Sequence, residues 1–262
     1  MNKVKILAGL DAGHVNTKAI IMRGQEILGY CTAPTGFDVV AAAQTALDDA
    51  LDNAGISRGE LSGIVATGIF RDMINAPPVN VTGTVPEYMA DAKGALFLNK
   101  NSRTVIDIGG NIHKAICYDK NGDLLDVVQN DKCADGLGIF YTTMAKALGL
   151  SEQEMSELAL NSTRNLSVAV QCALSAESDA IDLLSQGNDI ADVADAVVRF
   201  IVERVADMCT CMSLTKEIVV AGGLAKSRAL IERLPSLIKR DARALNHPEY
   251  VGAIGAVISY GG

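Results

Sequence analysis

Residues 11–20 read Asp-Ala-Gly-His-Val-Asn-Thr-Lys-Ala-Ile, and residues 107–116 read Asp-Ile-Gly-Gly-Asn-Ile-His-Lys-Ala-Ile. Both stretches match the pattern Asp-x-Gly-x4-Lys-Ala-Ile, at positions 96 residues apart. Each copy follows an apolar segment and leads into another one, as expected for two strands joined by a tight turn. Coincidence between two glycine-containing hairpins explains this alignment poorly, since five residue positions agree. The repeat therefore predicts two half-molecules built on the same unit, facing each other across a cleft.

The rest of the chain alternates apolar, strand-like segments with segments of helical periodicity. We expect strands at residues 4–10, 17–22, 26–31, 64–67, 103–108, 113–118, 124–128 and 217–220. We expect helices at residues 37–54, 87–98, 140–148, 173–185, 190–212, 225–239 and 252–260. Mixed blocks of this kind predict an α/β protein. We divide it into an N-terminal lobe, 1–100, and a C-terminal lobe, 101–262, with the last helix able to pack back on the first lobe.

The composition excludes several classes of function. With 262 residues, 49% of them hydrophobic, the chain has enough apolar material for a packed core. Its 31 acidic and 23 basic residues give a net charge of −8, which argues against binding to nucleic acid or an anionic membrane. No apolar stretch reaches the roughly 18–20 residues that span a bilayer, and Asp11 comes too early for a signal peptide. We expect a soluble, cytoplasmic protein.

The repeated turns have the features of a phosphate-binding site. Gly13 and Gly109 allow positive φ angles and let a bulky anion approach the exposed backbone N–H groups. Asp11 and Asp107 stand at the ends of buried strands, where an isolated charge is costly. Such carboxylates are tolerable beside a hydrated Mg²⁺, which binds through few carboxylates and keeps several waters. The two turns therefore predict a site for a magnesium–nucleotide complex.

Two lysines and a third glycine pair extend this site. Lys18 and Lys114 either neutralise phosphate oxygens or are solvated strand residues. Gly222 and Gly223 follow another apolar strand and precede a predicted helix. Such a junction can pass under an adenine–ribose unit, or bind a phosphate at the helix N-terminus. Each turn alone is a weak signal, but the three in this order indicate a nucleoside triphosphate held between two lobes.

Competing motifs do not fit. Residues 221–227 superficially resemble the end of a Walker A loop, but Ala225 stands where that motif needs glycine before Lys226. Gly136 and Gly138 lack the third glycine of a dinucleotide-binding fingerprint. The histidines have no metal-ligand spacing, and no Ser-His-Asp set can be assembled.

The turns at 11–18, 107–114 and 219–225 resemble the phosphate-1, phosphate-2 and adenosine motifs of the actin, Hsp70 and sugar-kinase superfamily. The segment Asn130-Asp-Lys-Cys-Ala-Asp-Gly-Leu-Gly-Ile-Phe140 is similar to the signature NDKCAxGxGxF of the activator ATPases of 2-hydroxyacyl-CoA dehydratases. Residues 170–179 resemble their second signature, a cysteine followed by Ala-Glu-Ser-Glu, and residues 246–256 resemble the ATPase subunits of ATP-dependent benzoyl-CoA reductase. This resemblance to the BadF/BadG/BcrA/BcrD type covers nearly the whole chain.

The resemblance implies a fold, an activity and a set of site residues. The fold is α/β, with duplicated actin-like (ribonuclease H-like) lobes around a nucleotide cleft. The activity is that of an ATP-hydrolysing electron donor. It would pass electrons to a partner iron–sulfur dehydratase or reductase that acts on CoA esters, and a ferredoxin or flavodoxin would reduce the donor. The implied catalytic residues are Asp11, Asp107 and Asn111. The implied nucleotide-binding residues are Gly13, His14, Val15, Asn16, Lys18, Gly109, Gly110, Gly222, Gly223 and Leu224.

The resemblance also implies ATP or ADP, Mg²⁺ and one [4Fe–4S] cluster per dimer as cofactors, with Cys133 and Cys172 as cluster ligands. The residues support this independently, because only these two cysteines precede a strong predicted helix, whose positive end favours an anionic cluster. A cluster usually takes four thiolates, which two chains related by a twofold axis supply. The alternative is that both cysteines pack in the core. Of the others, Cys31 and Cys117 are expected to be buried thiols, and Cys209 and Cys211 to point to different faces of one helix.

The chain departs from the family at the second turn. The activators usually continue this motif as Gly-Gly-Gln-Asp, whereas this chain has Gly109-Gly110-Asn111-Ile112. If the usual side chains position the attacking water, Asn111 is the remaining candidate here. Because a protein mainly positions and neutralises the groups in phosphoryl transfer, this change is expected to lower the rate rather than abolish binding.

Two alternative functions remain open. A small-molecule, sugar-type kinase of the same fold would need a carboxylate base in the cleft, for which Asp72 or Asp91 could serve. An ATP-gated regulator without enzymatic activity would bind nucleotide but need no iron. For the electron donor itself, the second subunit is either identical or a related chain, and ATP-driven lobe closure is expected to change the dimer angle.

Overall fold

The computed structural model describes residues 4–130, 136–168, 173–215 and 217–261. Contacts divide the chain into two units. The first contains Met1–Val105, Ile116–Leu125 and Asn246–Gly262, and the second contains Ile106–Ala115 and Asp126–Leu245. The C-terminal segment therefore belongs with the first unit, although it follows the second unit in sequence.

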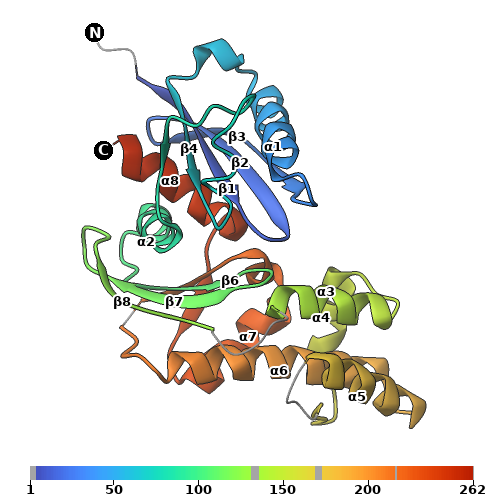
Figure 1. Ribbon diagram of the computed structural model, residues 1–262. Helices are drawn as coiled ribbons and strands as arrows, with labels where there is room; N and C mark the ends of the chain where they lie inside the picture. Colours follow the sequence, from blue (N-terminus) through green and yellow to red (C-terminus); the bar gives the residue numbers. More distant parts are fainter. Residues whose placement is uncertain (1–3, 131–135, 169–172, 216, 262) are drawn as a thin grey trace. The chain divides into compact units, whose positions relative to one another are not determined.

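The first unit is built on a five-stranded sheet in the order β3-β2-β1-β4-β5 (Figure 1). Its strands are β1 (Ile6–Ala12), β2 (Asn16–Arg23), β3 (Glu26–Pro34), β4 (Gly63–Thr67) and β5 (Gly83–Thr84). Strand β2 pairs antiparallel with β1 and β3, while β4 pairs parallel with β1 and β5. The register places Asp11 opposite Lys18 on β2 and opposite Thr67 on β4. The first repeat thus forms the predicted hairpin.

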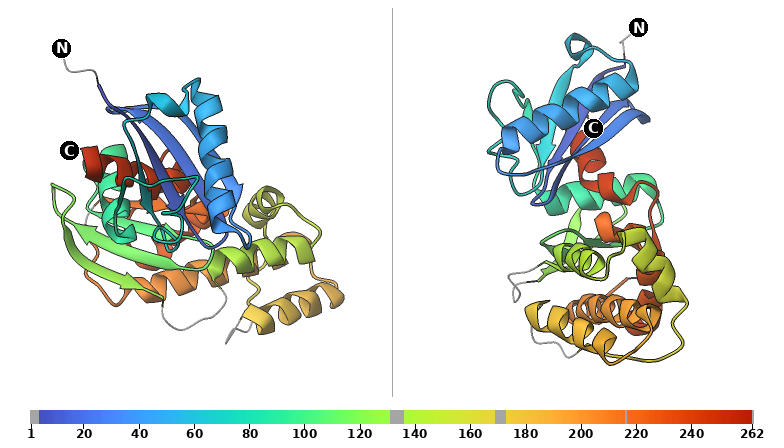
Figure 2. Two further views of the ribbon diagram at one scale, coloured as in Figure 1. Left: turned by 45° about the horizontal axis from the view of Figure 1, so that its top comes forward. Right: turned by 90° about the vertical axis from the view of Figure 1, so that its right-hand side faces the viewer.

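Helices cover both faces of this sheet, so its central strands are buried on both sides. The helical segments are α1 (Val39–Ala54), α2 (Glu87–Leu98), α8 (Val251–Gly261) and the short 3-10 turns η1 (Arg58–Glu60) and η3 (Pro248–Tyr250). Ala8 and Leu10 of β1 pack in one cluster with α1, whereas Leu7 packs in another with α8. The views of Figure 2 show α1 and α8 on opposite sides of the sheet.

Glycines let α8 approach its neighbours closely. A Cβ atom at Gly255 would lie 1.6 Å from the carbonyl oxygen of Ala90 on α2, and one at Gly94 would lie 2.0 Å from that of Val251 on α8. On the sheet side, a Cβ at Gly9 of β1 would lie 2.2 Å from the carbonyl oxygen of Ala253. These backbones meet at distances that only residues without side chains permit.

The second unit contains the sheet in the order β10-β9-β6-β7-β8. Its strands are β6 (Thr104–Ile108), β7 (His113–Tyr118), β8 (Leu124–Gln129), β9 (Ile218–Ala221) and β10 (Ala242–Ala244), with the first residues of β6 and the neighbouring ends of β7 and β8 grouped in the first unit. Both sheets have the same strand order. In each, three consecutive strands lie side by side (β3-β2-β1 and β8-β7-β6), and two strands from later in that sheet's part of the chain follow beside the first of the three (β4-β5 and β9-β10). The two units therefore repeat one topology.

Helices of the second unit enclose a single large apolar cluster. They are α3 (Leu137–Ala147), α4 (Glu152–Leu160), α5 (Ala173–Ser185), α6 (Ile190–Cys209) and α7 (Arg228–Ile238), with the 3-10 turn η2 (Gly223–Lys226) before α7. The 20-residue α6 is the main packing element, with residues such as Val197, Ile201 and Val205 fully buried. Figure 2 shows α5 running beside α6.

Some boundaries differ from the sequence-based expectations. Helix α3 begins at Leu137, three residues earlier than expected, and α6 ends at Cys209, three residues before the predicted end at Met212. The expected helix over 225–239 is split into η2 and α7, because Ser227 interrupts it as the N-cap of α7. Helix α4 was not predicted from the sequence.

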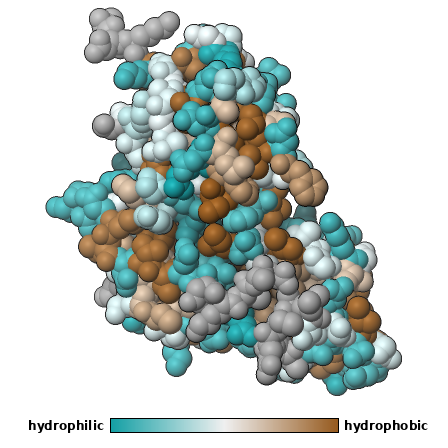
Figure 3. Space-filling view, viewed as in Figure 1, coloured by the Kyte–Doolittle hydropathy of each residue, from teal (hydrophilic) through white to brown (hydrophobic). Residues whose placement is uncertain are grey.

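The surface carries scattered hydrophobic residues. On the face drawn in Figure 3, hydrophobic and hydrophilic residues are interspersed. Phe37 and Leu125 are the most exposed large hydrophobic side chains among the described residues, as expected for a protein whose surface always retains some apolar area. Within the described part of the chain, no helix combines the length and the hydropathy needed to cross a lipid bilayer.

Candidate functional site

The first repeated turn joins β1 to β2 and holds a carboxylate and an ammonium group side by side. The antiparallel register pairs Asp11 with Lys18, and the Lys18 Nζ atom donates to Asp11 Oδ2 at 3.0 Å. Both side chains are partly exposed, 13% for Asp11 and 19% for Lys18. An ion pair at the surface end of a buried strand stays accessible to a ligand while neutralising the carboxylate.

The tip of this turn is fixed by residues that follow β3. The Thr35 hydroxyl donates to the carbonyl oxygen of Gly13 at 2.8 Å, and the Thr35 N–H donates to that of Val15 at 2.9 Å. Thr17 and Thr35, both buried, share a hydrogen bond of 2.9 Å. Thr35 thus binds two carbonyl oxygens of the turn, and His14 and Val15 remain exposed while Asn16 is half-buried.

Two glycines from other segments crowd around Asp11. A Cβ at Gly68, which has a φ of +89°, would lie 2.6 Å from Asp11 Oδ1. A Cβ at Gly252 of α8 would lie 3.5 Å from Asp11 Oδ2 and 3.2 Å from Oδ1 of Asp91 on α2. Asp91 is only 4% exposed. Two carboxylates thus converge within the first unit, where their oxygens could bind a cation directly or through water.

The second repeated turn has the same pairing in a more buried setting. Lys114 Nζ lies 3.1 Å from Asp107 Oδ2, as Lys18 does from Asp11, but the Lys114 side chain is only 3% exposed. The Gly109 N–H closes the turn on the carbonyl oxygen of Ile112 at 3.0 Å. The structure therefore pairs each predicted aspartate with the lysine seven residues later, a contact that the sequence analysis did not predict.

His113 lies beside this pair and is neutral. Its side chain is 6% exposed, and its Nδ1 atom has no hydrogen-bond partner among the residues that the structure describes. Burial lowers the pKa of His113 from 6.5 to about 4, against the opposing charge of Asp107, which raises it. The neighbouring backbone is firmly paired, because the His113 N–H donates to the Asn130 side chain at 2.9 Å and the Asn130 N–H to the His113 carbonyl at 3.0 Å. His113 therefore adds no positive charge to this turn at neutral pH.

The third turn, after β9, packs directly against the second. Gly222 has a φ of +87°, and a Cβ there would lie 2.4 Å from both Asp107 Oδ1 and the Ile108 carbonyl oxygen. Gly223 is exposed with open space around it, whereas the Leu224 side chain is buried. A ligand at this turn would thus meet the backbone of Leu224 rather than its side chain.

The structure describes four of the six cysteines, Cys31, Cys117, Cys209 and Cys211. Cys133 and Cys172 lie outside the residues that the structure describes. Cys117 is buried, as expected. Cys31 is only partly buried, with its thiol 3.6 Å from the Asp49 carboxylate, so the prediction of a buried thiol is wrong for Cys31. Burial and this carboxylate raise the pKa of the Cys31 thiol.

Cys209 and Cys211 do differ in exposure, since Cys209 is buried and Cys211 is exposed. The expectation that both lie on one helix is wrong, because α6 ends at Cys209. Among the described residues, these two cysteines, like Cys31 and Cys117, form no disulfide.

Several functional candidates could not be found from the sequence. Thr35 and Gly68 support the first turn from distant segments, and the sequence gives no local signal for either role. Of the two alternative bases, Asp72 is 74% exposed and pairs with Arg71 at 3.6 Å. Asp91, which the sequence analysis named without distinguishing it from Asp72, is the buried one. A charged residue among the small apolar residues of α2 is a sequence signal that could have singled it out.

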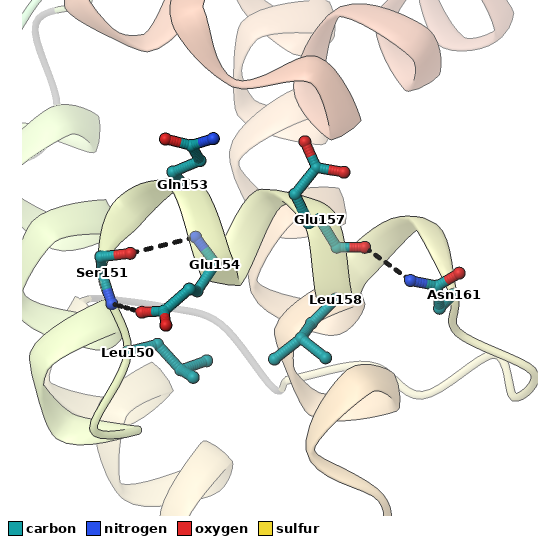
Figure 4. A pocket seen from close by; sticks show the side chains of 7 residues that line it. All are labelled: Leu150, Ser151, Gln153, Glu154, Glu157, Leu158 and Asn161. Carbon is teal, nitrogen blue, oxygen red and sulfur yellow. Dashed lines mark hydrogen bonds between the residues drawn. The ribbon is translucent and has the colours of Figure 1, made fainter.

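A surface pocket of about 540 Å³ lies along α4 (Figure 4). It is lined by Leu150, Ser151, Gln153, Glu154, Glu157, Leu158 and Asn161. Glu154 is already engaged, because its carboxylate accepts from the Ser151 N–H at 2.8 Å in a helix-capping box. None of the predicted site residues lines this pocket, and its acidic rim does not suit a phosphate.

The chain is similar to known proteins over nearly its whole length. The chain is 32% identical over 251 residues to the activator of lactoyl-CoA dehydratase from Anaerotignum propionicum, covering 95% of each chain. It is 27% identical over 264 residues to a subunit of benzoyl-CoA reductase from Thauera aromatica, covering 97% of this chain and 92% of that one. Both relatives are matched over nearly their whole length.

Solved structures give the same result. The activator of the 2-hydroxyisocaproyl-CoA dehydratase from Clostridium difficile with bound ADPNP superposes with a TM-score of 0.91 at 27% identity, over 98% of this chain and 94% of that one. A component of the Acidaminococcus fermentans (R)-2-hydroxyglutaryl-CoA dehydratase superposes with a TM-score of 0.90 at 28% identity, over 97% of both. A ROK family glucokinase from Streptomyces griseus, at 14% identity and a TM-score of 0.61, shares the fold alone. The actin-like α/β fold is thus confirmed.

The sequence resemblance is confirmed over almost the entire chain. Residues 8–259 match one ATPase family, and this range contains all three glycine turns and both cysteine signatures. The chain belongs to the BadF/BadG/BcrA/BcrD ATPase family.

Proposed function

We propose that this chain is a cytoplasmic ATPase that activates a partner dehydratase or reductase of CoA esters by delivering one low-potential electron. The names of its relatives support the partner class, since one activates lactoyl-CoA dehydratase and another is a subunit of benzoyl-CoA reductase. The observation that carries the proposal is the repeated ion pair, Asp11–Lys18 at 3.0 Å and Asp107–Lys114 at 3.1 Å, in a chain of an ATPase family.

The two turns are proposed to bind one magnesium–ATP complex. The carboxylates of Asp11 and Asp107 suit a hydrated Mg²⁺, because they can accept hydrogen bonds from metal-bound waters without losing their lysine partners. Their side chains are 13% and 14% exposed, so each offers an oxygen at the surface of its unit. When bound, the ion would neutralise charge that develops on the phosphate oxygens during hydrolysis.

The backbone of the turns completes the nucleotide site. N–H groups at Gly13–Asn16 and at Gly110 would bind phosphate oxygens, with Lys18 and Lys114 supplying positive charge. Gly109, whose N–H donates to the Ile112 carbonyl oxygen, would contribute by leaving room for the phosphate. The exposed backbone at Gly223 would lie against the adenosine. The contact between Gly222 and the second turn supports this proposal, because the adenosine-binding turn then lies next to a phosphate-binding turn.

Asn111 is proposed to position the attacking water. It is half-buried and follows directly on the proposed phosphate-binding glycines. Its amide can both donate and accept a hydrogen bond, which suffices to orient water but not to remove a proton. Hydrolysis at this site is therefore expected to be slow and to depend on positioning.

The electron would be carried by a [4Fe–4S] cluster shared by two chains. Iron–sulfur clusters are held by cysteine thiolates, usually four, and each chain offers Cys133 and Cys172 in the family signatures. Cys172 directly precedes α5 in the sequence, and Cys133 precedes α3 by four residues. When bound, the cluster would supply one-electron redox chemistry at low potential. The proposed assembly is a homodimer, or a heterodimer with a related subunit, that works anaerobically and is reduced by a ferredoxin or flavodoxin.

Anaerobic purification tests this proposal most directly. We expect a brown protein with about two irons per chain, since one four-iron cluster is shared by two chains. Cys133→Ala should lose the iron and the colour, whereas Cys211→Ala, the matched control at an exposed free thiol, should keep both. Addition of ATP should then allow electron transfer to the partner enzyme.

Other outcomes would contradict the proposal in different ways. A colourless protein that transfers phosphate to a sugar would establish the kinase alternative. A protein that binds nucleotide without iron and without transferring phosphate would establish the regulator. Iron retained in full by Cys133→Ala would remove Cys133 from the ligand set.

A further inference from the structure

Helix α3 starts without a cap of its own. Its N-cap residue is Gly136, which offers no side-chain acceptor for the free amides of the first turn. Such amides need partners, because the first four N–H groups of a helix have none within the helix. The structure supplies one from the second repeated turn, since the Ile139 N–H donates to the carbonyl oxygen of Gly110 at 3.0 Å. The proposed phosphate-binding turn therefore caps α3.

The contact between this turn and α3 is made by backbone on both sides. A Cβ at Gly136 would lie 2.0 Å from the Cα of Asn111, and one at Gly138 would lie 2.7 Å from both the Gly109 carbonyl oxygen and the Gly110 Cα. Side chains do not fit at such distances, so both glycines are needed for the helix to reach the turn. This gives a physical reason for the Gly-x-Gly that follows Cys133 in the sequence.

A second contact ties α3 to the third turn. Tyr141, only 1% exposed, places its hydroxyl 3.2 Å from Ser227 Oγ and donates to the Glu152 carbonyl oxygen at 3.0 Å. Ser227 directly follows η2 and is the N-cap of α7. Its Oγ also lies 3.2 Å from the Ser156 hydroxyl on α4. Helix α3 is thus joined to both nucleotide turns of the second unit.

We propose that α3 reports nucleotide occupancy, with Gly136, Gly138 and Tyr141 as positioning residues that couple its N-terminal turn to the proposed phosphate site. The inference rests on the proposed function, because it takes Gly109–Asn111 as a phosphate-binding turn. A phosphate that engages the N–H groups of this turn fixes the orientation of its peptides, and with them the Gly110 carbonyl that caps α3. Nucleotide binding therefore stabilises the first turn of α3, which begins four residues after Cys133.

The coupling has a thermodynamic consequence. If nucleotide favours the capped form of α3 by a certain factor, then the capped form must bind nucleotide more tightly than the uncapped form by that same factor. A variant that loses the cap therefore binds nucleotide more weakly. Couplings of this kind usually amount to about 5- to 150-fold. The structural role of α3 in the core does not require any such dependence on nucleotide, so the two roles can be separated by experiment.

Hydrogen–deuterium exchange on the full chain, with and without Mg²⁺–ADPNP, measures this coupling. In the unsubstituted protein we expect nucleotide to slow exchange in residues 109–114 and to slow the amides of residues 137–141 about 10-fold. Gly138→Ala should reduce the second effect to less than about 3-fold. Tyr141→Phe keeps the ring and loses only the hydroxyl, and it should also reduce the slowing of exchange in residues 137–141. The result therefore does not depend on Gly138→Ala folding correctly.

Gly59→Ala is the matched control, because Gly59 has open space around its Cβ position and lies in the first unit. It should keep the unsubstituted response. If nucleotide protects residues 109–114 but leaves α3 unchanged, the coupling is disproved while the proposed function stands. Protection of α3 that persists in full in both variants overturns the assignment of these positioning residues. Failure to protect residues 109–114 overturns the proposed function and this inference together.

Discussion

The same ion pair occurs twice in this chain, in two different environments. Lys18 and Lys114 each lie about 3 Å from the aspartate seven residues earlier, but their side chains are 19% and 3% exposed. Charge pairs that are partly exposed stabilise a fold little. Removal of one partner from a buried pair is costly, because the remaining charge is left without compensation.

Lys114→Met is therefore expected to lower the free energy of unfolding by about 3 kcal/mol, since it removes the partner of Asp107 from a pair whose lysine is shielded from water. Lys18→Met should cost only about 1 kcal/mol, since Lys18 is more exposed and water weakens its attraction to Asp11. Urea denaturation of both variants measures the difference. In a double-mutant cycle, Asp107→Asn should recover part of the loss in the Lys114→Met background. Equal losses for the two lysines would show that burial does not distinguish the pairs.

His113 makes stability depend on pH. Its pKa falls from 6.5 to about 4 on folding because of burial, so the unfolded chain binds more protons between these values. Stability from this group is full above pH 6.5 and falls as the pH drops towards 4. We expect a loss of about 2 kcal/mol between pH 7.5 and pH 4.5.

The matched variant for this prediction is His113→Phe, which keeps a ring of similar size without a titratable nitrogen. Urea midpoints at several pH values should decline less steeply on acidification in the variant than in the unsubstituted protein. Since other carboxylates titrate in both proteins, only the difference between the two curves belongs to His113. Parallel curves would disprove the role of His113.

At the scale of elements, local sequence signals explain what could be predicted. The hairpins were predictable because turn residues and apolar runs are neighbours in sequence. Helix α4 carried a signal that the periodicity analysis missed: Ser151 and Glu154 form a capping box. The short strand β10 and the close packing of α2 on α8 depend on segments far apart in the chain, so no local pattern indicates them.

The α2–α8 contact depends on the absence of a side chain at Gly255. Since a Cβ there would lie 1.6 Å from the Ala90 carbonyl oxygen, Gly255→Ala has to push the two helices apart. We expect a loss of about 3 kcal/mol in the free energy of unfolding, the upper range for overpacking. Gly59→Ala should change stability by less than about 0.5 kcal/mol. Similar urea midpoints for the two variants would contradict the close contact.

At the scale of the whole molecule, the repeat predicted the duplicated topology, whereas the two Asp–Lys ion pairs became visible only in the structure. It could not predict the supports of the site, because Thr35, Gly68 and Gly252 reach the first turn from three other segments. The same limit applied to α3, whose cap comes from the Gly110 carbonyl rather than from its own sequence. Chemistry repeated in the sequence was predictable, and contacts created by the folded chain were not.

The duplication leads to a prediction about catalysis. If one magnesium–ATP complex uses a carboxylate from each repeat, Asp11→Asn and Asp107→Asn should each lower the rate of ATP hydrolysis at least about 100-fold, because each loses charge that orients the hydrated ion. Chelation with EDTA should abolish hydrolysis, and added Mg²⁺ should restore it. Steady-state phosphate release measures both effects.

Asp72→Asn is the control for this pair, because Asp72 is exposed and its only ion pair among the described residues is with Arg71. Its rate should stay within about twofold of the unsubstituted protein, as expected for an exposed charge that forms only a surface ion pair. A large effect in one of the repeats alone would mean that a single turn carries the metal. In that case the second ion pair would serve the fold only, and the greater burial of Lys114 suggests that the second repeat would be the structural one.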